Sequence, residues 1–181
     1  MNEGKRRTII LGLVFLFFLT LAYVENTSFF VYIQGSFTTN PPLAVVLLFI
    51  HNVLAISLII LGMAFYVEIV LNFMPKRQIE YVTIQNPSIF AVVFTAMILL
   101  MSILRANTLI TGEIDIGKLV LVILISVPNA LVEGYGIFQA IKKTLSKKLT
   151  IRSLGLIYLI FFLAAIVEVG FVQLLPLISA K

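Results

Sequence analysis

Val127-Pro128-Asn129-Ala130-Leu131-Val132-Glu133-Gly134 places a proline, an amide, a carboxylate and a glycine inside an apolar run of helix length. A carboxylate in hydrocarbon costs about 2.5–3.5 kcal/mol on insertion scales, so Glu133 is expected to face protein, water or a cation rather than lipid. Pro128 removes an amide donor and can kink a helix, and Gly134 allows another backbone to come close. The stretch predicts a bent helix inside a bundle.

The composition around this stretch is that of an integral membrane protein. Of the 181 residues, 61% are hydrophobic and 12% are charged, and the mean hydropathy of +1.13 is well above that of ordinary water-soluble domains. The chain has no cysteine, which excludes disulfides, cysteine nucleophiles and thiolate metal sites, and its one histidine is too few for a histidine-rich metal cluster. We therefore expect an all-α, polytopic helix bundle without a metal or a cofactor.

Five apolar segments are predicted to cross the bilayer, for which about 17–25 residues are needed. The first, residues 8–24, follows a basic triplet and resembles a signal peptide, but it lacks a small-x-small cleavage site and is interpreted as a retained signal anchor. Residues 25–42 hold aromatic side chains and no Lys or Arg, as expected of an interfacial belt on the outer side. The other spans are predicted at residues 43–73, 88–111, 119–141 and 154–178.

These spans define a single membrane domain, residues 1–181, with a core of four spans over residues 43–178. Lys and Arg outside the spans number three at the N-terminus, two in the loop at 74–87 and five after the fourth span, against one in the loop at 112–118 and one at the C-terminus. Because cytoplasmic loops carry an excess of these residues, the count predicts a cytoplasmic N-terminus. The net charge of +5 therefore reflects membrane topology rather than nucleic-acid binding.

The most basic loop contains Lys142, Lys143, Lys147, Lys148 and Arg152. The simplest interpretation is that this loop determines the membrane topology by remaining in the cytoplasm. Basic residues next to a membrane also attract anionic headgroups, so the loop could bind lipid or a protein partner as well.

Four of the predicted spans contribute polar side chains to one layer of the membrane. With about 1.5 Å rise per residue, His51 and Asn52 lie about 12–14 Å below the outer edge, Arg105 about 10 Å and Glu168 about 14 Å. Asn129 and Glu133 fall near or just below the middle of the bilayer. The candidate buried polar site consists of His51, Asn52, Arg105, Asn107, Asn129, Glu133 and Glu168.

Two interpretations of this layer are open. It could bind an ion, a proton or a polar ligand, with Glu133 and Glu168 as carriers. Alternatively, it is a network of ion pairs and amides that joins the helices, with Arg105 paired with Glu168. Glu68, near the inner end of its span, is expected to reach water and is not placed in the site. No catalytic residue is assigned, because the spans lack a Ser-His pair at helix spacing, a second histidine and paired aspartates.

The order and spacing of these polar residues resemble the stage II sporulation protein M family of prokaryotic integral membrane proteins. The motifs that carry the resemblance are Phe49-Ile50-His51-Asn52 with Gly62, Asn107-Thr108 with Gly112, Pro128-Asn129-Ala130-Leu131-Val132-Glu133, and Ala165-Ile166-Val167-Glu168. Threonine replaces the glycine of the family's Asn-Gly, and Pro128-Asn129-Ala130 replaces its Pro-His-Gly. A role that requires that histidine is therefore not carried over to this chain.

The resemblance implies a multi-pass protein of the prokaryotic cell membrane that acts as a non-enzymatic scaffold or subunit. Family members in spore formers work in a membrane complex with cell-wall-degrading proteins. The alternative is a small transporter or channel component that uses Glu133 and Glu168 near the midplane. Five spans are few for a monomeric transporter, so this alternative needs a homo-oligomer. The expected partners are the lipid bilayer and other membrane proteins, and not nucleic acid.

Overall fold

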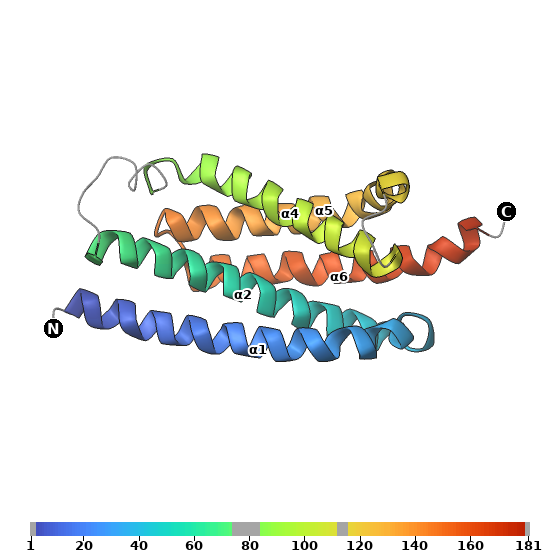
Figure 1. Cartoon of the computed structure of the whole chain (residues 1–181), viewed down its shortest axis with the longest axis horizontal. Helices are drawn as coiled ribbons and strands as arrows, with labels where there is room; N and C mark the ends of the chain where they lie inside the picture. Colours follow the sequence, from blue (N-terminus) through green and yellow to red (C-terminus); the bar gives the residue numbers. More distant parts are fainter. Residues whose placement is uncertain (1–2, 74–83, 112–115, 180–181) are drawn as a thin grey trace.

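The computed structural model describes residues 3–73, 84–111 and 116–179, and every element over these ranges that is long enough to name is a helix (Figure 1). The helices are α1 (Glu3–Thr39), α2 (Pro41–Phe73), α4 (Pro87–Thr111), α5 (Ile116–Leu145) and α6 (Ile151–Ser179). Side-chain surroundings are described for residues 3–24, 36, 39–73, 84–103, 117, 123 and 127–173. The all-α class expected from the sequence is confirmed.

The helices run back and forth along one long axis (Figure 1). The start of α1, the end of α2, the start of α4 and the connection between α5 and α6 lie at one end of the bundle. The start of α2 and the end of α6 lie at the other end. The Lys and Arg residues that open α1 and those that follow α5 therefore lie at the same end of the molecule.

Three helices in the described part of the chain are long and apolar enough to cross a membrane, over Glu3–Val24, Pro41–Phe73 and Ile151–Gln173. The part of α4 whose side chains are described, Pro87–Ile103, is apolar as well. Large apolar side chains such as Phe17 and Leu131 stand exposed on the outside of the bundle. An apolar exterior of this extent is unfavourable in water and favourable in lipid. These features indicate a membrane protein.

Prolines and capping side chains set where several helices begin. Asn40 precedes Pro41, and its Oδ1 accepts a hydrogen bond from the Leu43 amide at 3.2 Å, which caps α2. At the start of α6, Thr150 and Ser153 cap each other reciprocally: the Ser153 amide donates to Thr150 Oγ1 at 3.2 Å, and the Thr150 amide donates to Ser153 Oγ at 2.9 Å. Helices α2 and α6 therefore begin within three residues of the starts expected for their spans.

The first helix differs from the expectation. The sequence predicted a span over residues 8–24 followed by an interfacial segment, whereas α1 continues to Thr39 and has 37 residues. No proline interrupts the chain before Pro41, so nothing in the segment forces the helix to end earlier. At 1.5 Å per residue α1 is about 55 Å long, which exceeds a hydrocarbon core of about 30 Å. It must therefore tilt or project beyond the core.

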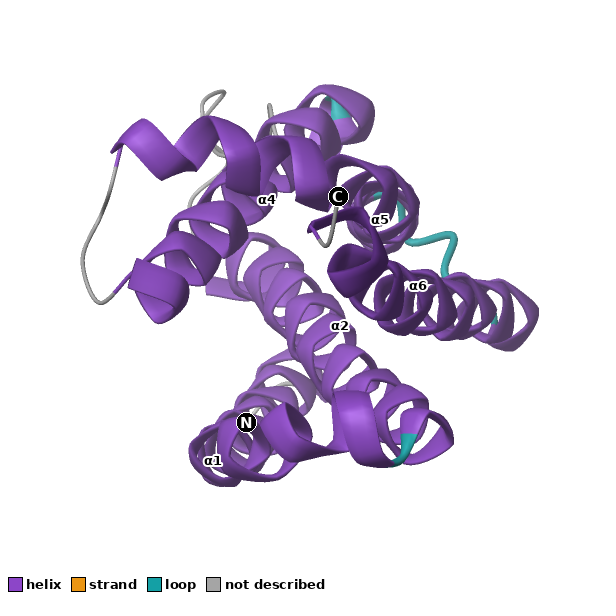
Figure 2. Ribbon diagram, turned by 90° about the vertical axis from the view of Figure 1, so that its right-hand side faces the viewer, coloured by secondary structure: helices purple, strands orange, loops and turns teal. Residues whose placement is uncertain are grey.

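The main apolar core lies between α2, α4, α5 and α6. Its buried members are Ile56, Ile60, Val67, Ala91, Ile137, Ala140, Ile141, Leu145, Ile157 and Phe161. Figure 2 shows α2 between α1 and the α5–α6 pair, so α1 is an outer helix. Gly12 of α1 allows this helix to pack closely against α2, because a Cβ at Gly12 would lie 2.9 Å from a ring carbon of Phe65.

Helix α5 is bent, as the stretch around Pro128 predicted. Pro128 lies inside the helix, and the first turns of α5, coloured gold in Figure 1, lie across the direction of the remainder. A proline inside a helix removes one backbone hydrogen bond and its ring clashes with the preceding turn. Gly134 faces α4, where a Cβ would lie 2.9 Å from Leu99 Cδ1, so it accommodates a side chain rather than a neighbouring backbone.

Candidate functional site: a buried polar layer

Two hydrogen bonds between amides and carboxylates join three helices. Asn52 of α2 donates from Nδ2 to Oε1 of Glu133 on α5 at 3.3 Å. Asn129 of α5 donates from Nδ2 to Oε2 of Glu168 on α6 at 3.1 Å. Asn129 and Glu133 are four residues apart and so share one face of α5. We call Asn52, Asn129, Glu133 and Glu168 the polar layer.

The polar layer is shielded from the surroundings of the bundle. Asn52 is 9% exposed, and the other three side chains are partly buried. The two carboxylates are close enough to interact electrostatically, and the Asn129 side chain interacts with both of them. Amide groups can donate to a carboxylate without bringing in a charge of their own. The described layer therefore holds two acidic groups that neutral amides bridge.

One acceptor in the polar layer has no donor. Asn129 Oδ1 is buried and accepts no hydrogen bond from the residues that the structure describes. A buried polar atom without a partner costs about 1–3 kcal/mol. Two amide groups supply four N–H donors at most, whereas two ionised carboxylates and two amide oxygens can accept more bonds than that. The chemistry of the layer thus suits a further donor, which can be a proton on a carboxyl group, a water molecule or a cation.

The structure brings together Asn52, Asn129, Glu133 and Glu168 from the sequence-predicted site. Glu133 and Asn52, both members of that site, are in direct contact. His51 is the neighbour of Asn52 on α2 and is partly buried. Among the described residues, no three histidine or acidic side chains form a group suited to a metal ion.

Two further predicted residues lie in α4, beyond the part whose side chains are described. They are Arg105 and Asn107. The pairing of Arg105 with Glu168 therefore stays a prediction, and the described hydrogen bond to Glu168 comes from Asn129. The carboxylate has further lone pairs, so a second partner is compatible with that bond.

Glu68 was expected to reach water, and the structure shows its side chain largely but not completely covered. Its side chain is 15% exposed, because α1 packs over this end of α2. Asn72 donates from Nδ2 to Glu68 Oε2 at 2.9 Å and to Thr8 Oγ1 at 3.1 Å, and Arg7 Nη2 lies 3.9 Å from Glu68 Oε1. The spacing of Glu68 and Asn72, four apart on one helix face, was a usable signal for this cluster. The position of α1 was not visible in any local pattern.

Comparisons with known proteins give no relative for this chain. No protein-family model matches it. Searches of the curated proteins and of the solved structures also find no match. The resemblance to the sporulation protein family rests on the four sequence motifs alone.

Proposed function

We propose that this chain is a five-span protein of the prokaryotic cell membrane that acts as a non-enzymatic scaffold or subunit of a membrane complex. The observation that carries the proposal is the pair of bonds Asn52–Glu133 and Asn129–Glu168, which fixes α2, α5 and α6 against one another. A shift of one helix would leave polar groups without partners in apolar surroundings, so such bonds specify how the helices align. A bundle fixed in this way presents a constant surface to a partner.

The distribution of charge supports a cytoplasmic position for the end at which α1 begins. Lys5, Arg6 and Arg7 open α1, and Lys147 and Lys148 follow α5 at the same end (Figure 1). Loops that stay in the cytoplasm carry an excess of Lys and Arg. The first turn of α2, at the opposite end, has no basic residue. A five-span arrangement with its N-terminal end in the cytoplasm agrees with both observations.

The scaffold role is tested by isolating the tagged full chain from native membranes and measuring the amounts of co-purifying membrane proteins by quantitative mass spectrometry. We expect at least one partner in a fixed ratio to the chain. Glu133→Gln should keep that partner, because the amide retains the shape and an oxygen that accepts from Asn52. Asn129→Ala should reduce both the stability of the protein and the recovery of the partner.

Ser57→Ala is the matched control for these variants. Ser57 Oγ and Tyr158 Oη are hydrogen-bonded at 2.9 Å between α2 and α6, apart from the polar layer. The control should keep the partner. The absence of any partner in a fixed ratio would contradict the proposal, and so would loss of the partner in Glu133→Gln when that variant is as stable as the unaltered protein.

A second candidate function is that of a small transporter or channel component. The unpartnered Asn129 Oδ1 beside two carboxylates favours it, because acceptors in excess of donors suit a proton or a cation. Vesicles that contain the purified protein and a pH-sensitive or cation-sensitive dye would test it. Transport should be lost in Glu133→Gln and Glu168→Gln while both variants remain folded. A dye signal equal to that of empty vesicles would contradict this function.

A further inference from the structure

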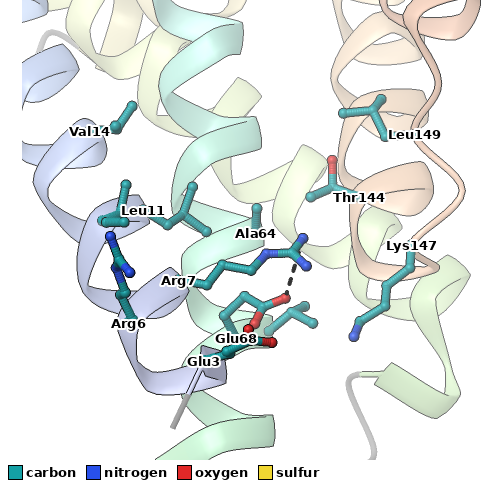
Figure 3. Close-up of a pocket in the computed structure, with 12 residues that line it drawn as sticks. Glu3, Arg6, Arg7, Leu11, Val14, Ala64, Glu68, Thr144, Lys147 and Leu149 are labelled. Atoms are coloured by element: carbon teal, nitrogen blue, oxygen red, sulfur yellow. Dashed lines mark ion pairs between the residues drawn. The ribbon is translucent and has the colours of Figure 1, made fainter. Parts of the chain in front are cut away.

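A cavity of about 720 Å³ lies at the end of the bundle where α1 begins (Figure 3). We call it the end cavity. It lies between α1, α2 and the end of α5 with its following loop, far along the bundle from the polar layer. Its apolar lining consists of Ile10, Leu11, Val14, Ala64, Val67 and Leu149. A pocket of this size and lining is typical of small-molecule sites in proteins.

Two cations reach into the end cavity from opposite walls. Figure 3 shows Arg7 extending from α1 towards the middle of the space and Lys147 extending into it from the end of α5. The Arg7 side chain is 77% exposed, and its contact with Glu68 Oε1 is long, at 3.9 Å. A guanidinium has five N–H donors in a planar fork. Most of the Arg7 donors are therefore open to an anion in the cavity.

Lys147 occupies a backbone position where glycine is usual. Its φ is 54°, in the left-handed region, and the amides of Lys147 and Lys148 donate to the carbonyls of Thr144 and Lys143 at 3.0 Å and 2.9 Å. This pair of bonds forms a Schellman motif, whose left-handed residue is most often glycine because a Cβ is unfavourable there. Backbone preference does not explain a lysine at this position. A positive charge directed into the end cavity gives a reason for a lysine there.

The charge of the end cavity is positive overall. Arg6, Arg7 and Lys147 line it together with two acids, Glu3 and Glu68. Glu68 already accepts a hydrogen bond from Asn72 at 2.9 Å, so its negative charge is partly compensated within the protein. An anion that enters between Arg7 and Lys147 meets more positive than negative charge.

The cavity also lies at the level expected for lipid headgroups. Arg7 is followed two and three residues later by Ile9 and Ile10, both exposed on the apolar surface of α1. The charged end of the cavity, at Arg7, therefore lies where the lipid-facing part of α1 begins. From Arg7 to Val14 the cavity wall continues for seven residues of helix, or about 10 Å. A soluble anion would leave this apolar wall in contact with water, whereas an acyl chain would cover it.

We propose that the end cavity binds one anionic phospholipid of the membrane leaflet at this end. Its phosphate lies between Arg7 and Lys147, and one acyl chain follows Leu11, Val14 and Val67 into the cavity. Basic pockets between membrane helices on the cytoplasmic side are suited to phosphate headgroups, and Arg recognises phosphate through paired N–H donors. The lipid would connect α1, which packs mainly on α2, to the loop after α5.

The test uses the full chain in detergent with added phosphatidylglycerol or phosphatidylcholine, and native mass spectrometry to count bound lipids across a titration. We expect one phosphatidylglycerol to bind in preference to phosphatidylcholine. Lys147→Gly should weaken its binding about fivefold, the effect of one charge near a lipid surface. This variant should fold, because glycine adopts the left-handed conformation without strain. Arg7→Gln should weaken binding at least as much.

Lys148→Gln is the matched control, since it removes the same charge one residue away from a lining position. It should bind phosphatidylglycerol as the unaltered protein does. Equal losses in Lys147→Gly and Lys148→Gln would overturn the proposal in favour of a general effect of surface charge. Equal binding of the two lipids would overturn it too. Glycerol phosphate should not compete for the site at the concentration at which the lipid saturates it, and competition there would indicate a site for a soluble phosphate instead.

Discussion

At the scale of single residues, Asn129 has the central position in the polar layer. Its Nδ2 donates to Glu168, its side chain also interacts with Glu133, and its Oδ1 is buried without a partner. One amide thus stands between two carboxylates from neighbouring helices. Because a hydroxyl or methyl group could not serve both, the identity of this residue is important for the arrangement of α5 and α6.

Asn129→Ala should lower the free energy of unfolding by about 1–3 kcal/mol, the cost of leaving a buried polar group unsatisfied. The change removes the donor to Glu168 and leaves that carboxylate in an apolar environment. Denaturant unfolding in mixed micelles would measure it. Ser57→Ala, which removes one neutral hydrogen bond between membrane helices, should cost about 0.6 kcal/mol. An effect of Asn129→Ala no larger than that of Ser57→Ala would show that the Asn129–Glu168 bond is not stabilising.

The predicted pair Arg105–Glu168 has its own test at this scale. An unpaired guanidinium about 10 Å inside hydrocarbon is costly, and so is the carboxylate that it would leave behind. Arg105→Met combined with Glu168→Gln should therefore destabilise the protein less than the sum of the two single changes. Thermal unfolding of the four proteins in one detergent would give the coupling. Strictly additive effects would mean that the two residues are not paired.

At the scale of the helices, glycines determine how closely neighbours approach. A Cβ on Gly136 of α5 would lie 2.9 Å from a ring carbon of Phe161 and 3.2 Å from Ile160 Cγ2, both on α6. Phe161 is itself a buried core residue, so its ring has little space into which it could move. Gly170, also in α6, has no atom within 4 Å of such a Cβ. The two glycines thus have different roles.

Gly136→Ala and Gly170→Ala should change stability in opposite directions. Overpacking at the α5–α6 interface costs about 1–3 kcal/mol, so Gly136→Ala should lower the unfolding temperature. Alanine in place of an exposed helical glycine gains about 0.5–1 kcal/mol, so Gly170→Ala should raise it. Thermal unfolding in one detergent compares the two directly. A stabilising effect of Gly136→Ala would mean that α5 and α6 are less closely packed than the structure shows.

At the scale of the whole molecule, the alternating direction of the described helices places the basic residues of α1 and of the loop after α5 at one end. Over the residues that the structure describes, three helices are long and apolar enough to span a membrane by length and composition. The bend in α5 and the 37 residues of α1 mean that helix length alone does not define a span. The orientation of the bundle therefore needs a measurement on the intact chain.

Single cysteines provide that measurement, because the chain has no cysteine of its own. Gln85→Cys and Lys148→Cys stand at exposed positions at the end where α1 begins, and Thr39→Cys stands at an exposed position at the other. A membrane-impermeant thiol reagent should label Thr39→Cys in intact cells and the other two only after the membrane is opened. Labelling of Lys148→Cys and Thr39→Cys from the same side would contradict the five-span topology.

Local signals in the sequence were sufficient to determine where several helices begin, the bend in α5 and part of the polar layer. The starts of α2 and α4 follow from Asn-Pro sequences, and the bend in α5 from Pro128. The common face of Asn129 and Glu133 follows from their spacing of four residues. These features depend on groups within one or two helical turns, so the order of residues alone determines them.

Only the tertiary structure decided which distant groups meet. Glu168 bonds Asn129, Glu68 is covered by α1, and Arg7 and Lys147 share a cavity although 140 positions separate them in the chain. Each of these contacts depends on how two helices are rotated and crossed. In a chain whose helices are apolar on nearly every side, no single hydrophobic stripe specifies that rotation, and it is set instead by where glycines and polar side chains find complementary neighbours.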